Sequence, residues 1–305
     1  KVSNEVESKV SNEVESKVSF KRKSKVSNEV ESKISKTKNC SPLRYPGGKT
    51  RACKIIDSIL KEHFNISEFQ TLVSPFFGGG SFEFYLQNKY GYRLIVNDKF
   101  TPLYNFWKQV KINKNILCDE LSKVESVSKE LFLSFRKSIL NLNCNMLEQA
   151  FQYFIINRCS FSGSTLSGGF SNEASKKRFT PSSIDKIRSL DFTNIDIYNF
   201  DFEYFINFFT NQSESESIGT DKTMIFLDPP YYLESKLYGN NGDLHENFNH
   251  QLLFDTIKTK RNWLMTYNNC GYIRELYRDY IIIDVDRSYG MNKSKSSSEI
   301  IIISK

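Results

Sequence analysis

The segment "QTLVSPFFGGGSFEF", residues 70–84, decides the fold class. A strand-forming run at 70–75 passes into three consecutive glycines, and a helix-forming segment follows them. Glycines at a strand-to-helix turn let the backbone approach a ligand closely, and the N-terminus of the next helix presents free amide groups. The order predicts a nucleotide-binding α/β fold, although three glycines alone also fit a flexible turn.

An acidic residue strengthens this interpretation. Asp98 lies 20 residues after Gly78, at the end of the next predicted strand, "RLIVN" at 93–97. At this position of a βαβ unit a carboxylate accepts hydrogen bonds from ribose hydroxyl groups. Together the two features predict a nucleoside ligand, and the nicotinamide cofactor of a dehydrogenase also satisfies both.

The rest of the chain alternates apolar strands with helical segments, which predicts a parallel sheet covered by helices. The last two strands are expected to form an antiparallel hairpin. About 95 residues separate the second strand from the third, too many for one crossover, so an inserted domain is expected there. Further strands are predicted at 193–198, 223–227, 262–267, 280–286 and 298–304.

Four parts are expected along the chain. Residues 1–40 repeat the octad "KVSNEVES" and carry ten Lys or Arg against six Glu, which predicts a solvated, disordered tail or, as an alternative, a partner-binding coil. A catalytic domain is expected in two pieces, 41–112 and 191–305. Between them, 113–190 is expected to be a mostly helical target-recognition insertion. A chain without an initial methionine is expected to be a fragment or a processed protein.

Composition excludes several classes of protein. No apolar run approaches the roughly 20 residues that cross a bilayer, and the N-terminus lacks a signal-peptide core, so we expect a cytoplasmic protein, or one in a viral or host nucleic-acid compartment, that is not secreted and not in a membrane. The six scattered cysteines form no ligand clusters, which predicts reduced thiols and no metal. A net charge of +7 is compatible with a polyanionic partner.

One segment of the insertion is basic. Residues 118–157 are predicted to be helical, whereas 158–180, rich in Ser, Gly and basic residues, is predicted to be a loop or hairpin. Such a projection suits contact with phosphates. On composition alone a solvated loop fits equally well. A second loop, at the surface, is predicted at 211–222.

The tetrapeptide "DPPY", residues 228–231, suits activation of an exocyclic amine, which is a poor nucleophile because its lone pair is delocalised into the ring. Asp228 can accept one amine hydrogen and the carbonyl of Pro229 the other as nitrogen attacks a methyl group. Pro229 and Pro230 fix φ, so these acceptors are preset. Tyr231 can stack on an extruded base. A strand end with an aspartate-capped turn is the alternative.

The upstream segment "SPLRYPGGKTRACK", residues 41–54, is basic and contains no acid. Tyr45 can stack on a cofactor, and Lys49 can offer a cation to a carboxylate. A linker turn before a basic helix start is the alternative interpretation.

Four motifs occur in a fixed order: "RYPGGK" at 44–49, "PFFGGGSFE" at 75–83, "NRCSFSG" at 157–163 and "DPPYY" at 228–232. In this order they resemble the Dam-type DNA adenine-N6 methyltransferases of the alpha amino-methyltransferase group, over residues 41–305. The resemblance implies a Rossmann-like methyltransferase sheet with a target-recognition insertion. It also implies methyl transfer from S-adenosylmethionine, without a metal, to N6 of an adenine flipped out of double-stranded DNA.

The resemblance also implies roles for individual residues. Those implied to bind the cofactor are Tyr45, Lys49, Pro75, Phe76, Gly78, Gly80, Asp98, Asp201, Phe202 and Asp228. The catalytic residues would be Asp228, Pro229, Pro230 and Tyr231. Those expected to face DNA are Arg44, Asn157, Arg158, Phe161, Ser162, Lys176, Lys177 and Arg178.

The segment "NRCSFSGSTLSGG", residues 157–169, departs from the GATC-methylating members of the family. Those members carry a Tyr-Asn pair and a nearby Arg where Phe161, Ser162 and Leu166 stand. Base readout depends on such side chains, so another short adenine-containing site is expected. The segment "TLSGGFS" is more similar to restriction-modification or large-virus relatives.

Several alternatives remain open at this point. DPPY can activate the N4 amine of cytosine as well as the N6 amine of adenine, and RNA is a possible substrate. A DNA-binding protein that keeps the fold without turnover is a further hypothesis. A monomer or weak dimer is expected, because one protomer contains every part that the chemistry needs.

Overall fold

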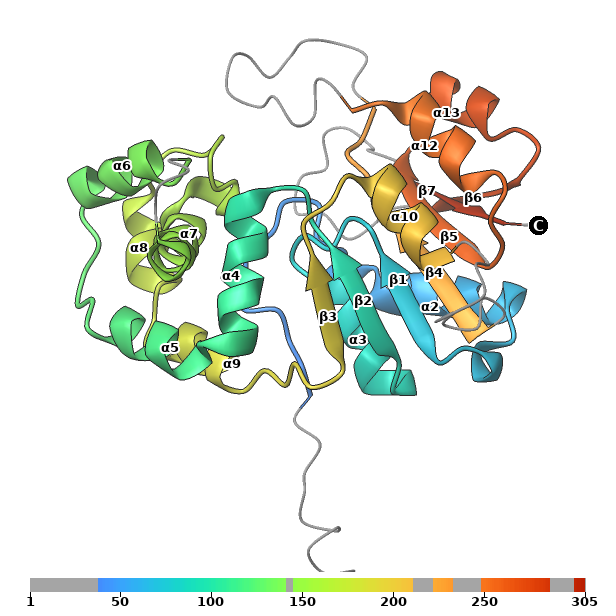
Figure 1. Cartoon of the computed structure of the whole chain (residues 1–305). Helices are drawn as coiled ribbons and strands as arrows, with labels where there is room; N and C mark the ends of the chain where they lie inside the picture. The colour runs from blue at the N-terminus through green and yellow to red at the C-terminus, as the bar shows by residue number, and fades with distance from the viewer. Residues whose placement is uncertain (1–37, 141–144, 211–221, 233–247, 286–298, 305) are drawn as a thin grey trace, which may run out of the picture. The chain divides into compact units, whose positions relative to one another are not determined.

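The computed structural model describes residues 38–140, 145–210, 222–232, 248–285 and 299–304 (Figure 1). By its contacts the chain divides into two units, Lys1–Lys38 and Asn39–Lys305, and every element below belongs to the second. The predicted tail at 1–40 and the predicted loop at 211–222 lie almost entirely outside the described residues.

The described residues form one seven-stranded sheet in the order β3-β2-β1-β4-β5-β7-β6. Strands β1 to β5 are parallel, and β7 is antiparallel to both β5 and β6. All seven predicted strands are confirmed to within two residues, as is the final hairpin. They are β1 (Thr71–Ser74), β2 (Arg93–Asn97), β3 (Ile195–Tyr198), β4 (Thr223–Leu227), β5 (Trp263–Asn268), β6 (Ile281–Val285) and β7 (Glu299–Ile303).

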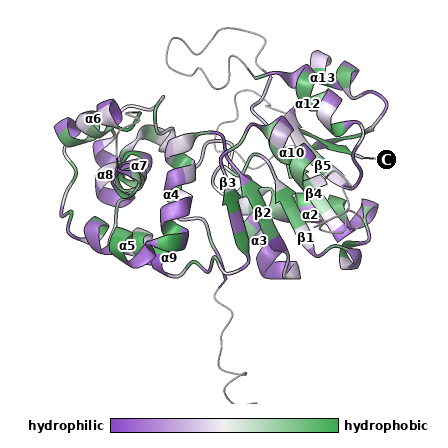
Figure 2. Ribbon diagram, viewed as in Figure 1, coloured by the Kyte–Doolittle hydropathy of each residue, from purple (hydrophilic) through white to green (hydrophobic). Residues whose placement is uncertain are grey.

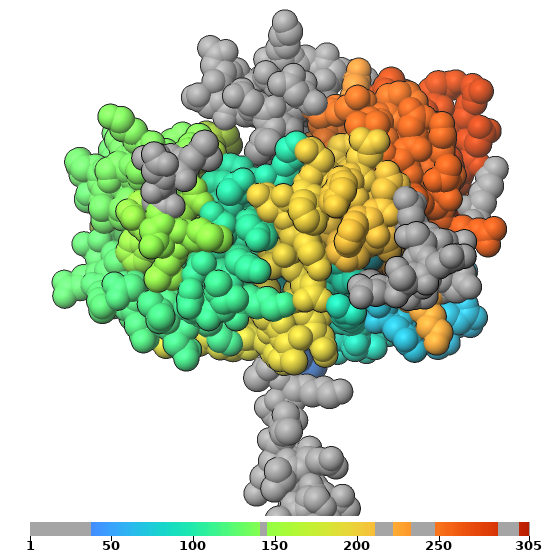
Figure 3. Space-filling model, viewed as in Figure 1, coloured from blue at the N-terminus to red at the C-terminus, as the bar shows by residue number. Residues whose placement is uncertain are grey.

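Helices cover both faces of the sheet, which is why its central strands β1 and β4 are buried along their whole length (Figures 1 and 2). Side chains alternate between faces along a strand, so Leu72 and Val73 enter two different apolar clusters. On one face lie α2 (Cys53–His63) and α3 (Ser81–Tyr90); on the other lie α10 (Phe202–Thr210), α12 (His250–Ile257) and α13 (Gly271–Leu276). In Figure 3 the yellow segment that contains α10 lies at the surface of the visible face.

The described residues between β2 and β3 form six α-helices: α4 (Thr101–Ile112), α5 (Lys114–Ser122), α6 (Lys129–Ser138), α7 (Met146–Cys159), α8 (Asn172–Lys177) and α9 (Pro181–Arg188). The helical stretch predicted at 118–157 is confirmed in α5, α6 and α7, but the chain leaves the helical conformation before Ser128. That residue caps α6 by accepting a 3.1 Å hydrogen bond from the backbone amide of Leu131.

The loop predicted across 158–180 is wrong at α8. The Ser171 side chain accepts a 3.1 Å hydrogen bond from the amide of Ala174 and caps the helix. One turn further on, Glu173 and Lys177 form a 3.0 Å ion pair. Cap and pair together favour a short helix in a Ser-rich segment. The described residues also contain three short 3-10 turns, η1 (Lys49–Arg51), η2 (Ile66–Glu68) and η3 (Phe161–Gly163).

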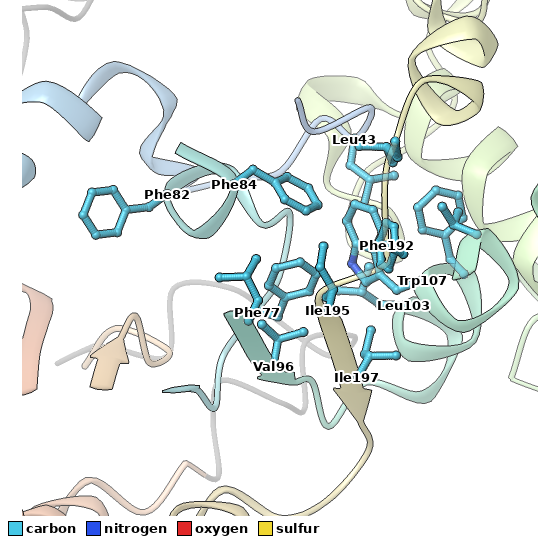
Figure 4. Close-up of a cluster of buried hydrophobic side chains, with 14 of the residues drawn as sticks. Leu43, Phe77, Phe82, Phe84, Val96, Leu103, Trp107, Phe192, Ile195 and Ile197 are labelled. Carbon is cyan, nitrogen blue, oxygen red and sulfur yellow. The ribbon is translucent and has the colours of Figure 1, made fainter. Parts of the chain in front are cut away.

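An aromatic core joins α4, the first helix after β2, to the glycine loop and α3 (Figure 4). Trp107 of α4 packs against Phe77, with ring centroids 5.2 Å apart, and Phe77 packs edge-to-face on Phe84 of α3. The indole nitrogen of Trp107 donates a 2.9 Å hydrogen bond to the carbonyl of Gly78. The first helix after β2 therefore fixes the position of the glycine loop.

Within the described ranges, no helix combines the length and hydrophobicity needed to cross a membrane. The same ranges contain no cluster of three or more His, Cys, Asp or Glu side chains that is able to hold a metal ion. Five cysteines are described and carry free thiols; Cys144 lies outside the described residues.

Candidate active site

The glycine loop and the DPPY segment follow adjacent strands. Although β1 and β4 are far apart in sequence, Val73 pairs with Ile225, so both strands end at the same edge of the sheet. Strand order reverses here, because β2 and β3 lie on one side of β1 and β4 and β5 lie on the other. Open α/β sheets bind ligands at this switch point. Residues 75–80 and 228–231 are thereby brought together.

The glycine loop leaves room for an aromatic ring. Gly78 has φ +49° and Gly80 has φ +67°, both in the left-handed region. A Cβ atom on Gly78 would lie 2.8 Å from a ring carbon of Tyr45, and one on Gly79 would lie 2.9 Å from the Tyr45 Cβ. The ring of Tyr45 therefore rests directly on the loop backbone, and 41% of this residue remains exposed.

Asp98 connects the end of β2 to the glycine loop. Its Oδ2 accepts a 2.9 Å hydrogen bond from the amide of Gly78, and its Oδ1 accepts one of 2.9 Å from the amide of Phe100. Burial raises the pKa of this carboxyl to about 6, and the two amide hydrogen bonds act in the opposite direction. Each oxygen keeps a second lone pair, so the carboxylate can still accept from two hydroxyl groups.

Asp228 is held by two side chains from distant segments. The ammonium of Lys49 lies 2.6 Å from Oδ1 and 2.8 Å from Oδ2. The hydroxyl of Thr266, on β5, donates a 2.6 Å hydrogen bond to Oδ1. The Lys49 side chain is only 3% exposed, whereas the Asp228 side chain is 23% exposed. Lys49 and Thr266 thus hold the carboxylate in place, while part of its surface stays accessible to solvent.

A second carboxylate stands behind this pair. Lys49 Nζ also donates to the hydroxyl oxygen of Tyr231 at 3.2 Å, and that hydroxyl in turn donates a short hydrogen bond to Oε1 of Glu299. Glu299 begins β7, is 5% exposed and lies 4.0 Å from Lys49 Nζ. Tyr231, predicted to be a catalytic residue that stacks on the base, is therefore also part of a hydrogen-bonded network.

A third acid lies beneath the glycine loop. Glu83, in the first turn of α3, is 3% exposed and accepts a 2.8 Å hydrogen bond from the hydroxyl of Ser74. Burial raises its pKa to about 8, and the negative charge of Asp228 adds a smaller contribution in the same direction. Sequence analysis missed Glu83 and Glu299. The sequence offered one signal for each: Glu83 is flanked by Phe82 and Phe84, and Glu299 stands at the start of an isoleucine run.

Apolar rings line one side of the loop. Phe76, Phe202 and Phe248 pack on one another with centroid separations of 5.8, 5.6 and 5.2 Å. Their flat surfaces match a purine ring in size and polarity. Asp201, predicted to bind the cofactor, is exposed and forms an ion pair with Lys99. Pro75 accepts a 3.1 Å hydrogen bond from Asn97 through its carbonyl, and Pro229 is buried while Pro230 is half-buried.

The NRCSFSG segment, residues 157–163, is anchored to the RYPGGK segment. Asn157, predicted to face DNA, is completely buried. Its amide oxygen accepts from the backbone nitrogen of Arg44 at 2.9 Å, and its amide nitrogen donates to the Arg44 carbonyl at 2.7 Å. Gly163 has φ +75°, and a Cβ there would lie 2.5 Å from the same carbonyl oxygen. Backbone contact between the two motifs is therefore tight.

The tip of the segment carries an exposed aromatic ring. Phe161 is 69% exposed, and its neighbour Ser162 has φ +55°. One isolated bridge between Ser160 and Phe170 closes the loop. The guanidinium of Arg136, on α6, supports the loop by donating hydrogen bonds to the carbonyls of Leu166 and Gly168. The ring is thus presented to solvent by a closed, supported loop.

Three guanidinium groups gather beside this loop. Arg158 donates to the carbonyls of Arg178 and Pro42 at 2.6 and 3.1 Å, and Arg44 donates to the carbonyl of Ser160 at 3.0 Å. Burial, followed by the charges of Arg44 and Arg178, lowers the pKa of Arg158 to about 10. An anion would relieve this repulsion. Lys176 is exposed, and Lys177 pairs with Glu173.

Comparison with known proteins decides the family. The model of the D12 class N6 adenine-specific DNA methyltransferase family matches residues 45–291. The chain belongs to this family. The matched residues include the glycine loop, the helices between β2 and β3 and the DPPY segment. The Dam-type resemblance and the Rossmann-like methyltransferase fold are confirmed.

A curated relative of this D12 class chain is the Type II methyltransferase M.MjaIII of Methanocaldococcus jannaschii. The two sequences are 28% identical over 132 residues, which are 40% of this chain and 46% of the relative. The match thus spans about half of the length of that protein.

Proposed function

We propose that the protein transfers the methyl group of S-adenosylmethionine to N6 of an adenine flipped out of a short site in double-stranded DNA. One observation carries the proposal: Asp228 stands at the open end of β4, beside the glycine loop, and is held there by Lys49 and Thr266. An acceptor placed there could meet both a cofactor in the glycine loop and an amine, which fits the N6 adenine-specific family to which the chain belongs.

The residues around the glycine loop fit the proposed cofactor. Asp98 retains two acceptor positions for the ribose hydroxyls, and the faces of Phe76 and Phe202 suit the purine. Tyr45 would cover the cofactor from the loop side, since the glycines leave no side chain between its ring and the backbone. When bound, S-adenosylmethionine supplies an activated methyl group on a sulfonium.

The chain's own groups would prepare the amine. An adenine N6 donates one hydrogen to Asp228 and the other to the carbonyl of Pro229, which draws the nitrogen toward tetrahedral geometry as its lone pair attacks. Thr266 holds Oδ1 of Asp228 in a fixed direction, so the acceptor does not reorganise during the reaction. The ring of Tyr231 would stack on the flipped base, while its hydroxyl is anchored by Glu299.

The insertion would hold the duplex. Arg44, Arg158 and Arg178 form a cationic cluster that suits a backbone phosphate, with Lys176 and Lys177 extending it. Phe161 would fill the space left by the flipped base, and Ser162 would lie against a neighbouring base. We assign Asn157 a positioning role, because its buried amide is used by the Arg44 backbone.

A transfer assay with radiolabelled S-adenosylmethionine tests the proposal. Unmethylated duplex DNA and RNA of the same sequence are the two acceptors. We expect label in the duplex DNA and none in RNA. Label in RNA alone would overturn the DNA assignment, and cofactor binding without any transfer would favour a DNA-binding protein without turnover. Light scattering of the active sample should give the mass of one chain, because every group named above comes from one protomer.

A further inference from the structure

The ion pair of Lys49 with Asp228 conflicts with the chemistry proposed for Asp228. As the amine nitrogen attacks a methyl group it acquires positive charge, and a nearby negative carboxylate stabilises that charge. Here the ammonium of Lys49 contacts both carboxylate oxygens, at 2.6 and 2.8 Å, and neutralises them. In this arrangement Asp228 has little net charge to offer the amine.

Lys49 has little access to water. It is 3% exposed, and its other two donated hydrogen bonds go to the carbonyl of Gly47 at 3.0 Å and to the hydroxyl of Tyr231 at 3.2 Å. A buried ammonium that leaves one carboxylate without reaching another is strongly disfavoured. Any release of Asp228 therefore requires a second anion within reach of Lys49.

Glu299 is that anion. Its Oε1 lies 4.0 Å from Lys49 Nζ, and its side chain is 7% exposed, so the attraction between the two groups is weakly screened. Tyr231 links them, because its hydroxyl accepts from Lys49 and donates to Glu299. A shift of the ammonium of about 1 Å would bring it into hydrogen-bonding distance of Glu299.

We propose that Glu299 is a positioning residue that receives the Lys49 ammonium when the amine of the target base reaches Asp228. The amine then meets a carboxylate no longer neutralised, and Lys49 stays paired. This inference rests on the proposed methyl transfer to an amine.

Two crystal structures of the wild-type protein test the movement directly, one with S-adenosylhomocysteine and one with S-adenosylhomocysteine and a duplex that contains its site. We expect Lys49 Nζ to lie within about 3 Å of a Glu299 oxygen, and out of contact with at least one Asp228 oxygen, only when the base is bound. Lys49 held by both Asp228 oxygens with the base in place would overturn the proposal. So would a Lys49 that moves to the cofactor's carboxylate instead.

Glu299→Gln separates a role of charge from a role of shape. Glutamine still accepts the hydrogen bond of Tyr231, so a merely structural Glu299 predicts an unchanged kcat. We expect kcat to fall about 10- to 100-fold, with KM for DNA and Kd for the cofactor within about twofold of wild type. Asp284→Asn, which removes an exposed acid on the neighbouring strand β6, is the matched control and should leave kcat unchanged.

An unchanged kcat in Glu299→Gln would overturn the proposal. Failure of the wild-type protein to methylate any nucleic acid would instead overturn the proposed function, and the two results are distinguishable because only the second concerns the unmodified chain.

Discussion

Lys49 and Asp228 are 179 positions apart in the sequence, yet the lysine ammonium contacts both oxygens of the aspartate, at 2.6 and 2.8 Å. The contact joins the RYPGGK and DPPY segments into one site. It exists because β1 and β4 are neighbours, so the segment that packs on the glycine loop also faces the end of β4.

Replacement of Asp228 by alanine should abolish methyl transfer and spare DNA binding. The carboxylate acts on the reacting amine and not on the phosphate backbone, so we expect a loss in kcat of at least about 10³-fold. Fluorescence anisotropy with a labelled duplex should give a Kd close to that of the wild type. Retained transfer together with lost DNA binding would contradict the role given to Asp228.

Cofactor affinity should fall in acid because of Asp98. Its pKa is raised to about 6, so the carboxyl becomes protonated below that pH and loses an acceptor for a ribose hydroxyl. If only the ionised form binds well, Kd should rise by about tenfold for each pH unit below 6. Titration calorimetry between pH 5 and 8 measures this slope, and Asp98→Asn should bind weakly with no such slope. An equally steep slope in Asp98→Asn would assign the effect to another group.

Protein stability should depend on pH through Glu83. Its folded-state pKa of about 8 lies above the 4.5 of an exposed glutamate, so the native state binds more protons than the unfolded state between these values. The free energy of unfolding should therefore fall as pH rises through this window, by up to about 1.4 kcal/mol per pH unit, and level off above pH 8.

Glu83→Gln should remove this dependence, because a neutral amide replaces a carboxyl that is mostly protonated at pH 7. Urea unfolding at pH 6, 7, 8 and 9 measures it, with Glu203→Gln, an exposed glutamate in the first turn of α10, as the control. Parallel stability curves for wild type and Glu83→Gln would show that this carboxyl does not titrate in the window.

Phe161→Ala should impair the DNA step and spare the cofactor step. The exposed ring would occupy the gap of the flipped base, so we expect weaker fluorescence of 2-aminopurine placed at the target position and altered site preference in a panel of duplexes. Cofactor Kd should stay unchanged. Phe208→Ala removes a ring of similar exposure on α10 and serves as the control. Identical flipping and site choice in Phe161→Ala and Phe208→Ala would show that Phe161 takes no part in base flipping or in site choice.

Arg178→Ala should weaken DNA binding in a salt-dependent way. Loss of one phosphate contact should reduce the slope of log Kd against log salt by about 1. Lys258→Ala, which removes a cation that pairs with Asp255 on α12, should leave the slope unchanged. Equal slopes in wild type and Arg178→Ala would show that Arg178 does not contact a DNA phosphate.

The sheet was predictable because most of its strands are short runs rich in β-branched and other apolar residues, which local pattern alone marks. The glycine loop and Asp98 were predictable for a related reason: their spacing follows from one βαβ unit. Helix α8 was not, because a single serine cap and one ion pair decide it against a composition typical of loops.

The inner part of the site was not predictable. Burial of Glu83 and Glu299 depends on packing from both sides of the sheet, which no local pattern shows. The same holds for Asn157, whose motif suggested contact with DNA while tertiary structure directs its amide to the Arg44 backbone. The link from Lys49 through Tyr231 to Glu299 joins three distant segments and required the strand order.

Identification of the methylated nucleoside is the most direct test of methyl transfer to N6 of adenine in DNA. The wild-type protein is incubated with S-adenosylmethionine and unmethylated genomic DNA, and the digested DNA is analysed by mass spectrometry. We expect N6-methyladenine, confined to one short sequence context. N4-methylcytosine in place of N6-methyladenine would contradict the assignment of adenine as the target base, and DNA without either modification would contradict the proposed reaction itself.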